Sequence, residues 1–127
     1  MIYSELLRQI LLAATALTFL GCALWALVRP NSLARVLGYE LRTANGQSEF
    51  HAIYIGVFLG QFALSVLAAY RVADAALGDL VAAFLLAQPL GRLVALIRFG
   101  APSGVLRLLF ALEAVGGVAL LLVRPAG

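Results

Sequence analysis

The sequence has little of what a water-soluble protein needs. It contains no lysine, and charged residues make up only 12% of its 127 residues. A soluble domain is about a quarter charged and about half apolar. Here 64% of the residues are apolar and the mean hydropathy is +1.03, which also excludes an intrinsically disordered chain. The class that remains is an integral membrane protein.

Cysteine and histidine are nearly absent as well. The chain has one of each, Cys22 and His51. A single thiol excludes an internal disulfide, and one thiol with one imidazole is too small a set for a metal or haem site. The sequence also lacks the phosphate-binding loop, the nucleophile elbow, the zinc-protease motif and the paired-cysteine motif. We therefore expect no metal and no cofactor.

The positive charges are all arginines, nine of them against six acidic residues. Most stand singly at the ends of apolar runs, where long cationic side chains reach toward lipid head groups. This placement favours membrane lipids as partners and argues against nucleic acid. The first and third loops carry more arginine than the other connections, so the positive-inside rule favours a cytoplasmic position for these two loops.

Four apolar runs are long enough to cross a bilayer, which takes about 20 residues each. They predict an all-α integral membrane protein, a four-helix bundle that forms one transmembrane domain over residues 1–127. The expected helices are residues 6–28, 49–70, 79–97 and 104–123.

The first loop contains a further helical pattern. Leu33, Val36 and Leu37 recur at helical spacing and Gly38 can end the segment, which predicts a short interfacial helix. The pair Asn45-Gly46 predicts a tight turn before the second spanning helix.

Charged residues inside apolar runs are the strongest functional signal, because each is costly unless it is paired or hydrated. Arg92 and Glu113 are such residues. At about 1.5 Å per residue they lie roughly 8 Å and roughly 12 Å below the helix ends that the third loop joins, so they can form a salt bridge if their helices are neighbours. The expected ligand-binding or polar cluster in this half of the bilayer comprises Glu49, His51, Tyr54, Gln88, Arg92 and Glu113.

The same residues also have a purely structural interpretation. The Arg92–Glu113 pair can simply hold two helices in register. His51 and Tyr54 are also typical interfacial residues, and Glu49 can favour a helix N-terminus. Gly56 and Gly60, four residues apart, together with Gly91, predict close helix packing, either inside the bundle, which we favour, or against a second copy.

Residues 48–56 read Ser-Glu-Phe-His-Ala-Ile-Tyr-Ile-Gly, and Gly60, Gly91-Arg92, Pro102 and Glu113 follow. This pattern resembles a family of small four-span bacterial membrane proteins classed as a domain of unknown function and distantly similar to DoxX-type proteins. His51 stands where that family usually has arginine, and Ile55 where it usually has the first of two glycines. The resemblance implies the four-helix fold and marks Glu49, Gly56, Arg92 and Glu113, but it implies no activity.

The leading hypothesis is a non-enzymatic protein of the bacterial inner membrane that binds a lipid-like or amphiphilic ligand, or a membrane partner, through the polar cluster. Arg92 would hold an anionic or carbonyl group, and Glu113 would keep this arginine charged and oriented. Two alternatives stay open. One is an enzyme acting on a lipid or isoprenoid with Glu113 or His51 as acid–base. The other is an accessory or assembly subunit, bound to a membrane protein or to a second copy, whose polar cluster is only structural.

Overall fold

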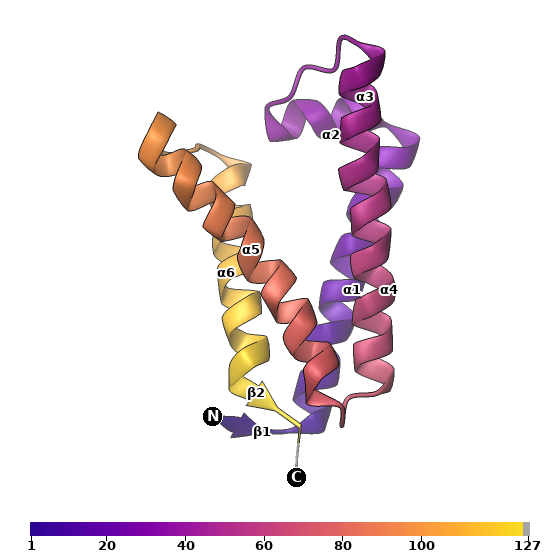
Figure 1. Cartoon of the computed structure of the whole chain (residues 1–127), viewed down its shortest axis with the longest axis vertical. Helices are drawn as coiled ribbons and strands as arrows, with labels where there is room; N and C mark the ends of the chain where they lie inside the picture. Colours follow the sequence, from indigo (N-terminus) through magenta and orange to yellow (C-terminus); the bar gives the residue numbers. More distant parts are fainter. Residues whose placement is uncertain (126–127) are drawn as a thin grey trace.

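The computed structural model describes residues 1–125 and is almost entirely helical (Figure 1). The helices are α1 (Glu5–Val28), α2 (Pro30–Leu37), α3 (Ala44–His51), the π-helical segment η1 (Ala52–Val57), α4 (Phe58–Tyr70), α5 (Ala75–Phe99) and α6 (Val105–Leu122). Because α3, η1 and α4 run on as one helix, four helices are long and apolar enough to cross a membrane. The all-α four-span fold and the short helix in the first loop are confirmed.

Local capping explains where two of these helices begin. The Ser4 side chain accepts a hydrogen bond from the Leu7 N–H at 3.1 Å and caps α1. The Thr43 side chain accepts one from the Gly46 N–H at 3.0 Å and caps α3. The predicted turn at Asn45-Gly46 is therefore wrong, because Thr43 draws these residues into the first helical turn.

The second and third spanning helices extend well beyond the expected bounds, whereas α6 is one residue shorter at each end than residues 104–123. The second begins at Ala44 instead of residue 49, and the third covers Ala75–Phe99 instead of residues 79–97. Asp74 occupies the N-cap position of α5. The earlier start places Asp79 one turn inside the helix instead of at its first residue.

The helices pack in two pairs. α1 packs mainly against α4, and α5 mainly against α6. The two pairs meet at the end of the molecule that holds both termini and separate toward the end that holds α2 (Figure 1). The main apolar core includes Leu12, Phe19, Val81 and Leu120, whereas a smaller core around Leu33 and Phe50 fixes α2.

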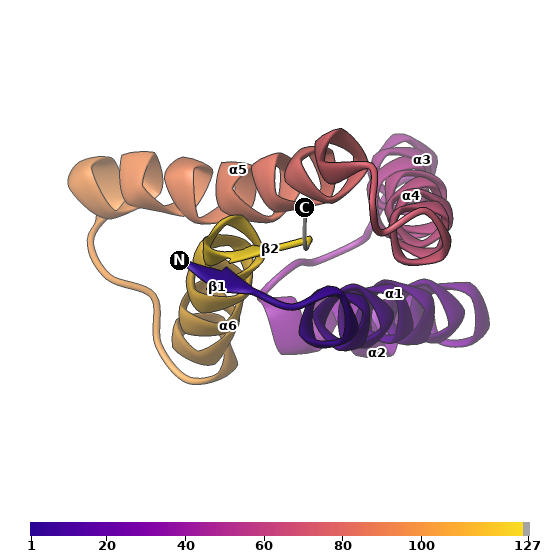
Figure 2. The same cartoon turned by 90° about the horizontal axis from the view of Figure 1, so that it is seen from below.

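A two-residue parallel strand pair joins the chain ends, which the sequence did not lead us to expect. β1 (Ile2–Tyr3) pairs with β2 (Val123–Arg124), and the Ser4 N–H donates to the Arg124 carbonyl at 2.9 Å. Figure 2 shows this pair, with β1 directly before the start of α1 and β2 directly after the end of α6. The N-terminus of α1 is thereby tied to the C-terminus of α6.

Arg8 lies just above this strand pair and is completely buried, with 0% of its surface exposed. Its Nη1 donates to the carbonyls of Leu120 at 2.6 Å and Val123 at 2.7 Å. Its Nη2 donates to the Ala75 carbonyl and to Asp79 Oδ1, both at 3.0 Å. One side chain on α1 therefore binds α5, α6 and β2 together.

Asp79 completes this network, because Arg124 donates to both of its carboxylate oxygens. This contact raises the pKa of Arg124 above its ordinary value, chiefly through hydrogen bonding to the Asp79 carboxylate. Gly78 makes room for Arg8, since a Cβ atom at this position would overlap the Arg8 guanidinium group. The half of the bundle next to the strand pair thus holds an ionic network around the buried Arg8, which we call the Arg8 network (Arg8, Asp79 and Arg124).

Candidate functional site

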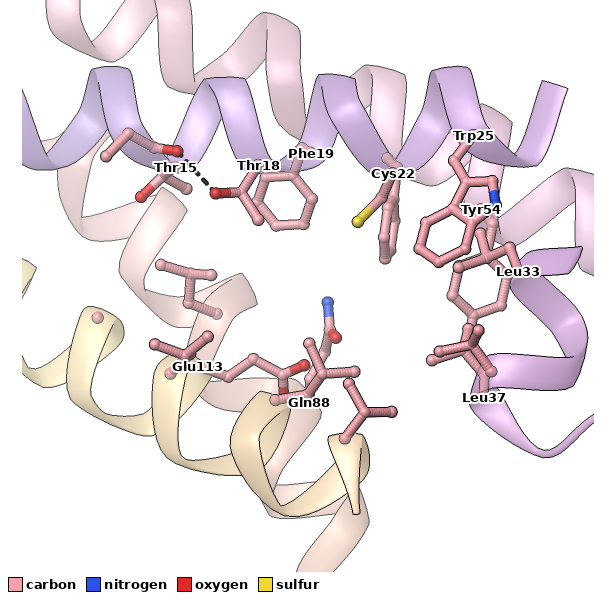
Figure 3. A pocket seen from close by; sticks show the side chains of 18 of the residues that line it. Thr15, Thr18, Phe19, Cys22, Trp25, Leu33, Leu37, Tyr54, Gln88 and Glu113 are labelled. Carbon is pink, nitrogen blue, oxygen red and sulfur yellow. Dashed lines mark hydrogen bonds between the residues drawn. The ribbon is translucent and has the colours of Figure 1, made fainter. Parts of the chain in front are cut away.

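A cavity of about 330 Å³ lies where the two helix pairs separate. Residues of α1, α2, η1, α4, α5 and α6 line it, and most of them are apolar. Its size falls at the lower end of the range of small-molecule sites, about 300–1,000 Å³. Figure 3 shows its walls, with α1 on one side and Gln88 and Glu113 on the other.

The wall from α1 is a stripe of residues spaced alternately four and three positions apart: Leu11, Thr15, Thr18, Cys22 and Trp25. The two threonine hydroxyls donate to backbone carbonyls of the same helix, those of Leu11 at 2.8 Å and Ala14 at 2.9 Å. Such bonds satisfy a hydroxyl inside its own helix. This wall is consequently small and uncharged, with its hydroxyl donors already used.

An aromatic wall stands beside it. The Phe58 ring contacts Phe19 and Tyr54 edge-on, in both cases with ring centroids 5.1 Å apart. The Tyr54 hydroxyl lies 3.3 Å from that of Tyr39. Trp25, the only tryptophan of the chain, lines the same cavity. These side chains offer a large apolar surface with a polar tip at Tyr54.

The wall from α5 and α6 carries the charge. Arg92 Nε donates to Glu113 Oε2 at 3.1 Å, and Arg92 Nη2 donates to Glu113 Oε1 at 3.0 Å. This ion pair agrees with the depth argument from the sequence, because α5 and α6 are neighbours. The side chains are 26% and 12% exposed, and both line the cavity. Gln88, one turn before Arg92 on α5, points into the same space (Figure 3).

The structure thus brings Tyr54, Gln88, Arg92 and Glu113 to one cavity, but not the other two residues of the expected cluster. Glu49 is exposed, and His51 places Nδ1 at 2.7 Å from the Gln47 carbonyl on its own helix. Neither residue lines the cavity. Phe50 is buried against α2, and at about 100° of rotation per residue its two neighbours face other directions, Glu49 exposed and His51 half-buried outside the cavity.

The glycines of the expected packing motif lie in open space. A Cβ atom built on Gly56, Gly60 or Gly91 meets no neighbouring side chain or second helix within 4 Å. Close approaches occur instead at Gly78, beside Arg8, and at Gly117, beside Leu86. Within the described chain, Gly56, Gly60 and Gly91 therefore mediate no close helix contact, and packing against a second copy stays a prediction.

Sequence reasoning missed two parts of this arrangement, although both leave a signal. The stripe on α1 repeats at heptad spacing, and Thr15, Thr18 and Cys22 interrupt an otherwise leucine- and alanine-rich helix. Arg8 and Asp79 each lie about one turn inside a helix that starts from the same membrane face. The depth comparison that links Arg92 to Glu113 would have linked these two as well, had the start of the third helix been placed correctly.

The fold and composition define a small integral membrane protein with four spanning helices. Among the residues that the structure describes, no group of histidine, cysteine and acidic side chains is arranged to hold a metal ion. Residues 7–124 match the family described as "Domain of unknown function (DUF4345)", and the chain belongs to this family. No curated protein and no solved structure matches the chain. The more distant similarity to DoxX-type proteins stays a prediction.

Proposed function

We propose that this protein binds a lipid-like or amphiphilic molecule in the cavity between its two helix pairs, without catalysing a reaction. The observation that carries the proposal is a mostly apolar cavity with one ion pair and one amide in its wall. Ligand sites have this composition, with many apolar contacts for affinity and a few polar groups that fix orientation. An amphiphile matches such a wall because it carries both kinds of surface on one molecule.

The ion pair is costly to build, and this supports a role beyond packing. Charged residues in spanning helices lose their hydration, and a buried pair is seldom more stabilising than apolar residues of similar volume. The fold is already held together at its other end by the Arg8 network, which the Arg92–Glu113 pair does not contact. A ligand therefore explains this second ion pair, which lines a cavity, better than a further need to stabilise helix packing does.

The enzymatic alternative receives less support from the same geometry. A general base must be free to take a proton from the substrate. Both Glu113 oxygens accept hydrogen bonds from Arg92, and His51 lies outside the cavity. We therefore favour binding. An accessory subunit remains the alternative if no small ligand is found.

We further propose that the protein lies in the bacterial inner membrane with α2 on the cytoplasmic side. Five arginines and two glutamates occupy the first and third loops and the adjoining helix ends, which gives this face a net charge of +3 (Arg29, Arg35, Arg42, Arg98, Arg107, Glu40 and Glu49). The opposite face carries three arginines and three acidic residues and is neutral. There Arg8 and Arg124 contact Asp79, and Arg71 lies 3.8 Å from Asp74. The positive-inside rule counts basic residues, here five arginines against three, and so supports a cytoplasmic position for the face that holds α2.

Cysteine labelling tests this orientation. In a Cys22→Ala background, we expect Ala73→Cys, in the second loop, to react with a membrane-impermeant maleimide on intact cells. Ser103→Cys, in the third loop, should react only after the cells are permeabilised. Both positions are exposed, so accessibility in the fold does not separate them. The opposite labelling pattern would reverse the proposed topology.

Ligand binding can be followed through Trp25, the only tryptophan. We expect bromine-labelled stearate or bromine-labelled stearamide, titrated into the detergent-solubilised protein, to quench Trp25 fluorescence saturably. Thr18→Phe fills the cavity and should raise the half-saturating concentration about fivefold or more, which is a loss of about 1 kcal/mol. Leu17→Phe is the matched control, because Leu17 is 68% exposed on the same helix and does not line the cavity. Equal quenching in both variants would mean that the probes bind the outer surface only.

A further inference from the structure

We propose that the cavity selects an uncharged head group, a carbonyl, amide or hydroxyl group on a single apolar chain, and not an anion. This inference rests on the proposed function, that the cavity binds an amphiphile, and it adds the chemical class of the head group. Its basis is the charge balance of the wall and the hydrogen-bonding groups that this wall leaves free.

The wall from α5 and α6 carries no net charge. Arg92 and Glu113 are joined by two parallel hydrogen bonds, of 3.1 Å and 3.0 Å, so the pair has no net charge. This two-point geometry is the strongest that an arginine makes with a carboxylate. An anionic head group would have to displace Glu113 from Arg92 or bring an unbalanced negative charge into an apolar cavity. Both routes are costly where water is scarce.

The groups left free on this wall suit a neutral partner. Arg92 Nη1 and the Gln88 amide make no hydrogen bond with residues 1–125. The Gln88 amide points into the cavity, near Glu113 (Figure 3). A carbonyl oxygen can accept from the Gln88 NH₂ group, and a hydroxyl or amide N–H can donate to Gln88 Oε1. The site therefore offers both donors and an acceptor.

The other walls supply no charge that would favour an anion. Thr18 and its neighbours on α1 are uncharged, and the aromatic wall has only the Tyr54 hydroxyl as a polar tip. Arg98 and Arg107 are exposed near the α5–α6 connection and do not line the cavity, and Arg29 and Arg35, near its α2 wall, are exposed and do not line it either. Arg107 Nε donates to the Pro102 carbonyl at 2.8 Å. Anionic lipids would be attracted to this outer surface and not into the cavity.

The volume of the cavity favours a single chain. About 330 Å³ is at the lower limit for a small-molecule site. Its mostly apolar lining continues from Gln88 toward Leu11 and Leu85, so a chain can extend away from the polar wall. This space suits one chain segment with a compact head group better than a two-chain lipid.

The test compares two probes with the same chain and different head groups, bromine-labelled stearamide and bromine-labelled stearate at a pH where the acid is ionised. Saturable quenching of Trp25 reports binding of each probe. We expect stearamide to half-saturate at a concentration about tenfold lower than stearate does, as desolvation of the carboxylate predicts. Gln88→Leu should weaken stearamide binding roughly threefold to tenfold, the value of one or two hydrogen bonds, and should leave stearate unchanged.

The outcomes separate this inference from the proposed function. If stearate binds as tightly as stearamide or more tightly, the neutral-head inference is overturned while amphiphile binding stands. If stearamide is preferred but Gln88→Leu binds it like the wild type, the assignment of the head group to this wall is wrong. If neither probe distinguishes Thr18→Phe from Leu17→Phe, the proposed function fails together with the inference.

Discussion

Replacing Arg8 by leucine is expected to lower the free energy of unfolding by about 3–5 kcal/mol, because it removes a fully buried cation that donates four hydrogen bonds. The substitution leaves the Asp79 carboxylate without one of its two partners. It also removes the donors that satisfy the carbonyls of Leu120, Val123 and Ala75. Because Arg8 joins α1 to α5, α6 and β2, we expect the variant to accumulate poorly in membranes and to unfold at a lower temperature in detergent.

Arg71→Leu is the matched control for this change. Arg71 is 60% exposed and lies 3.8 Å from Asp74, so its ion pair should contribute less than about 1 kcal/mol. Unfolding temperatures followed by circular dichroism compare the two variants directly. If Arg8→Leu and Arg71→Leu unfold at the same temperature, the Arg8 network does not hold the helix pairs together.

Glycine variants give an independent check on the same network. Gly78→Ala pushes a methyl group into the Arg8 guanidinium and should destabilise the protein, whereas Gly60→Ala meets open space. The two variants thus add the same methyl group at a tightly packed position, Gly78, and at an open one, Gly60. Equal effects of the two variants would mean that Arg8 can move away at no cost.

Replacing Glu113 by leucine is the second change with a large expected effect, a loss of about 3 kcal/mol of stability. It leaves the Arg92 guanidinium beside an apolar cavity without its carboxylate. This value is at the low end for a broken pair, because Arg92 keeps 26% exposure and part of its hydration. The double variant Arg92→Leu, Glu113→Leu removes both charges and should regain most of the lost stability.

The double variant also separates binding from structure. If the pair takes part in ligand binding, the double variant should fold but bind neither bromine-labelled probe as the wild type does. Thermal unfolding and Trp25 quenching on the same preparation measure the two properties. A double variant that is stable and binds both probes with wild-type affinity would leave the pair a purely structural role.

The fold was largely predictable because the bilayer leaves few structures in which all backbone polar groups are hydrogen-bonded. A single segment of about 20 apolar residues satisfies its own backbone in a bilayer only as a helix, so run length and composition predicted the spans. The interfacial helix was predictable from Leu33, Val36 and Leu37, because an amphipathic pattern ended by a glycine has few other solutions. Helix ends were less predictable, since capping by Thr43 depends on one side chain and overrides the turn preference of Asn45-Gly46.

The site was only partly predictable, for a different reason. The depth of Arg92 and Glu113 follows from residue counting, and their pairing follows from adjacent helices. The cavity itself depends on the angle at which the two helix pairs separate, and no local pattern encodes this angle. The Arg8 network joins the two helix pairs at the end that holds both termini, and the cavity lies toward the other end, where the pairs separate. Glu49 and His51 are close in sequence to Tyr54, which lines the cavity, but Phe50 between them is buried against α2 and they do not line the cavity.

Native mass spectrometry of the protein, extracted gently from its own membranes, tests the central claim most directly. We expect one bound small molecule per chain on the wild type and on Leu17→Phe, and a clearly lower occupancy on Thr18→Phe. A wild-type chain that carries no small molecule, or equal occupancy in Thr18→Phe and Leu17→Phe, would contradict ligand binding in this cavity.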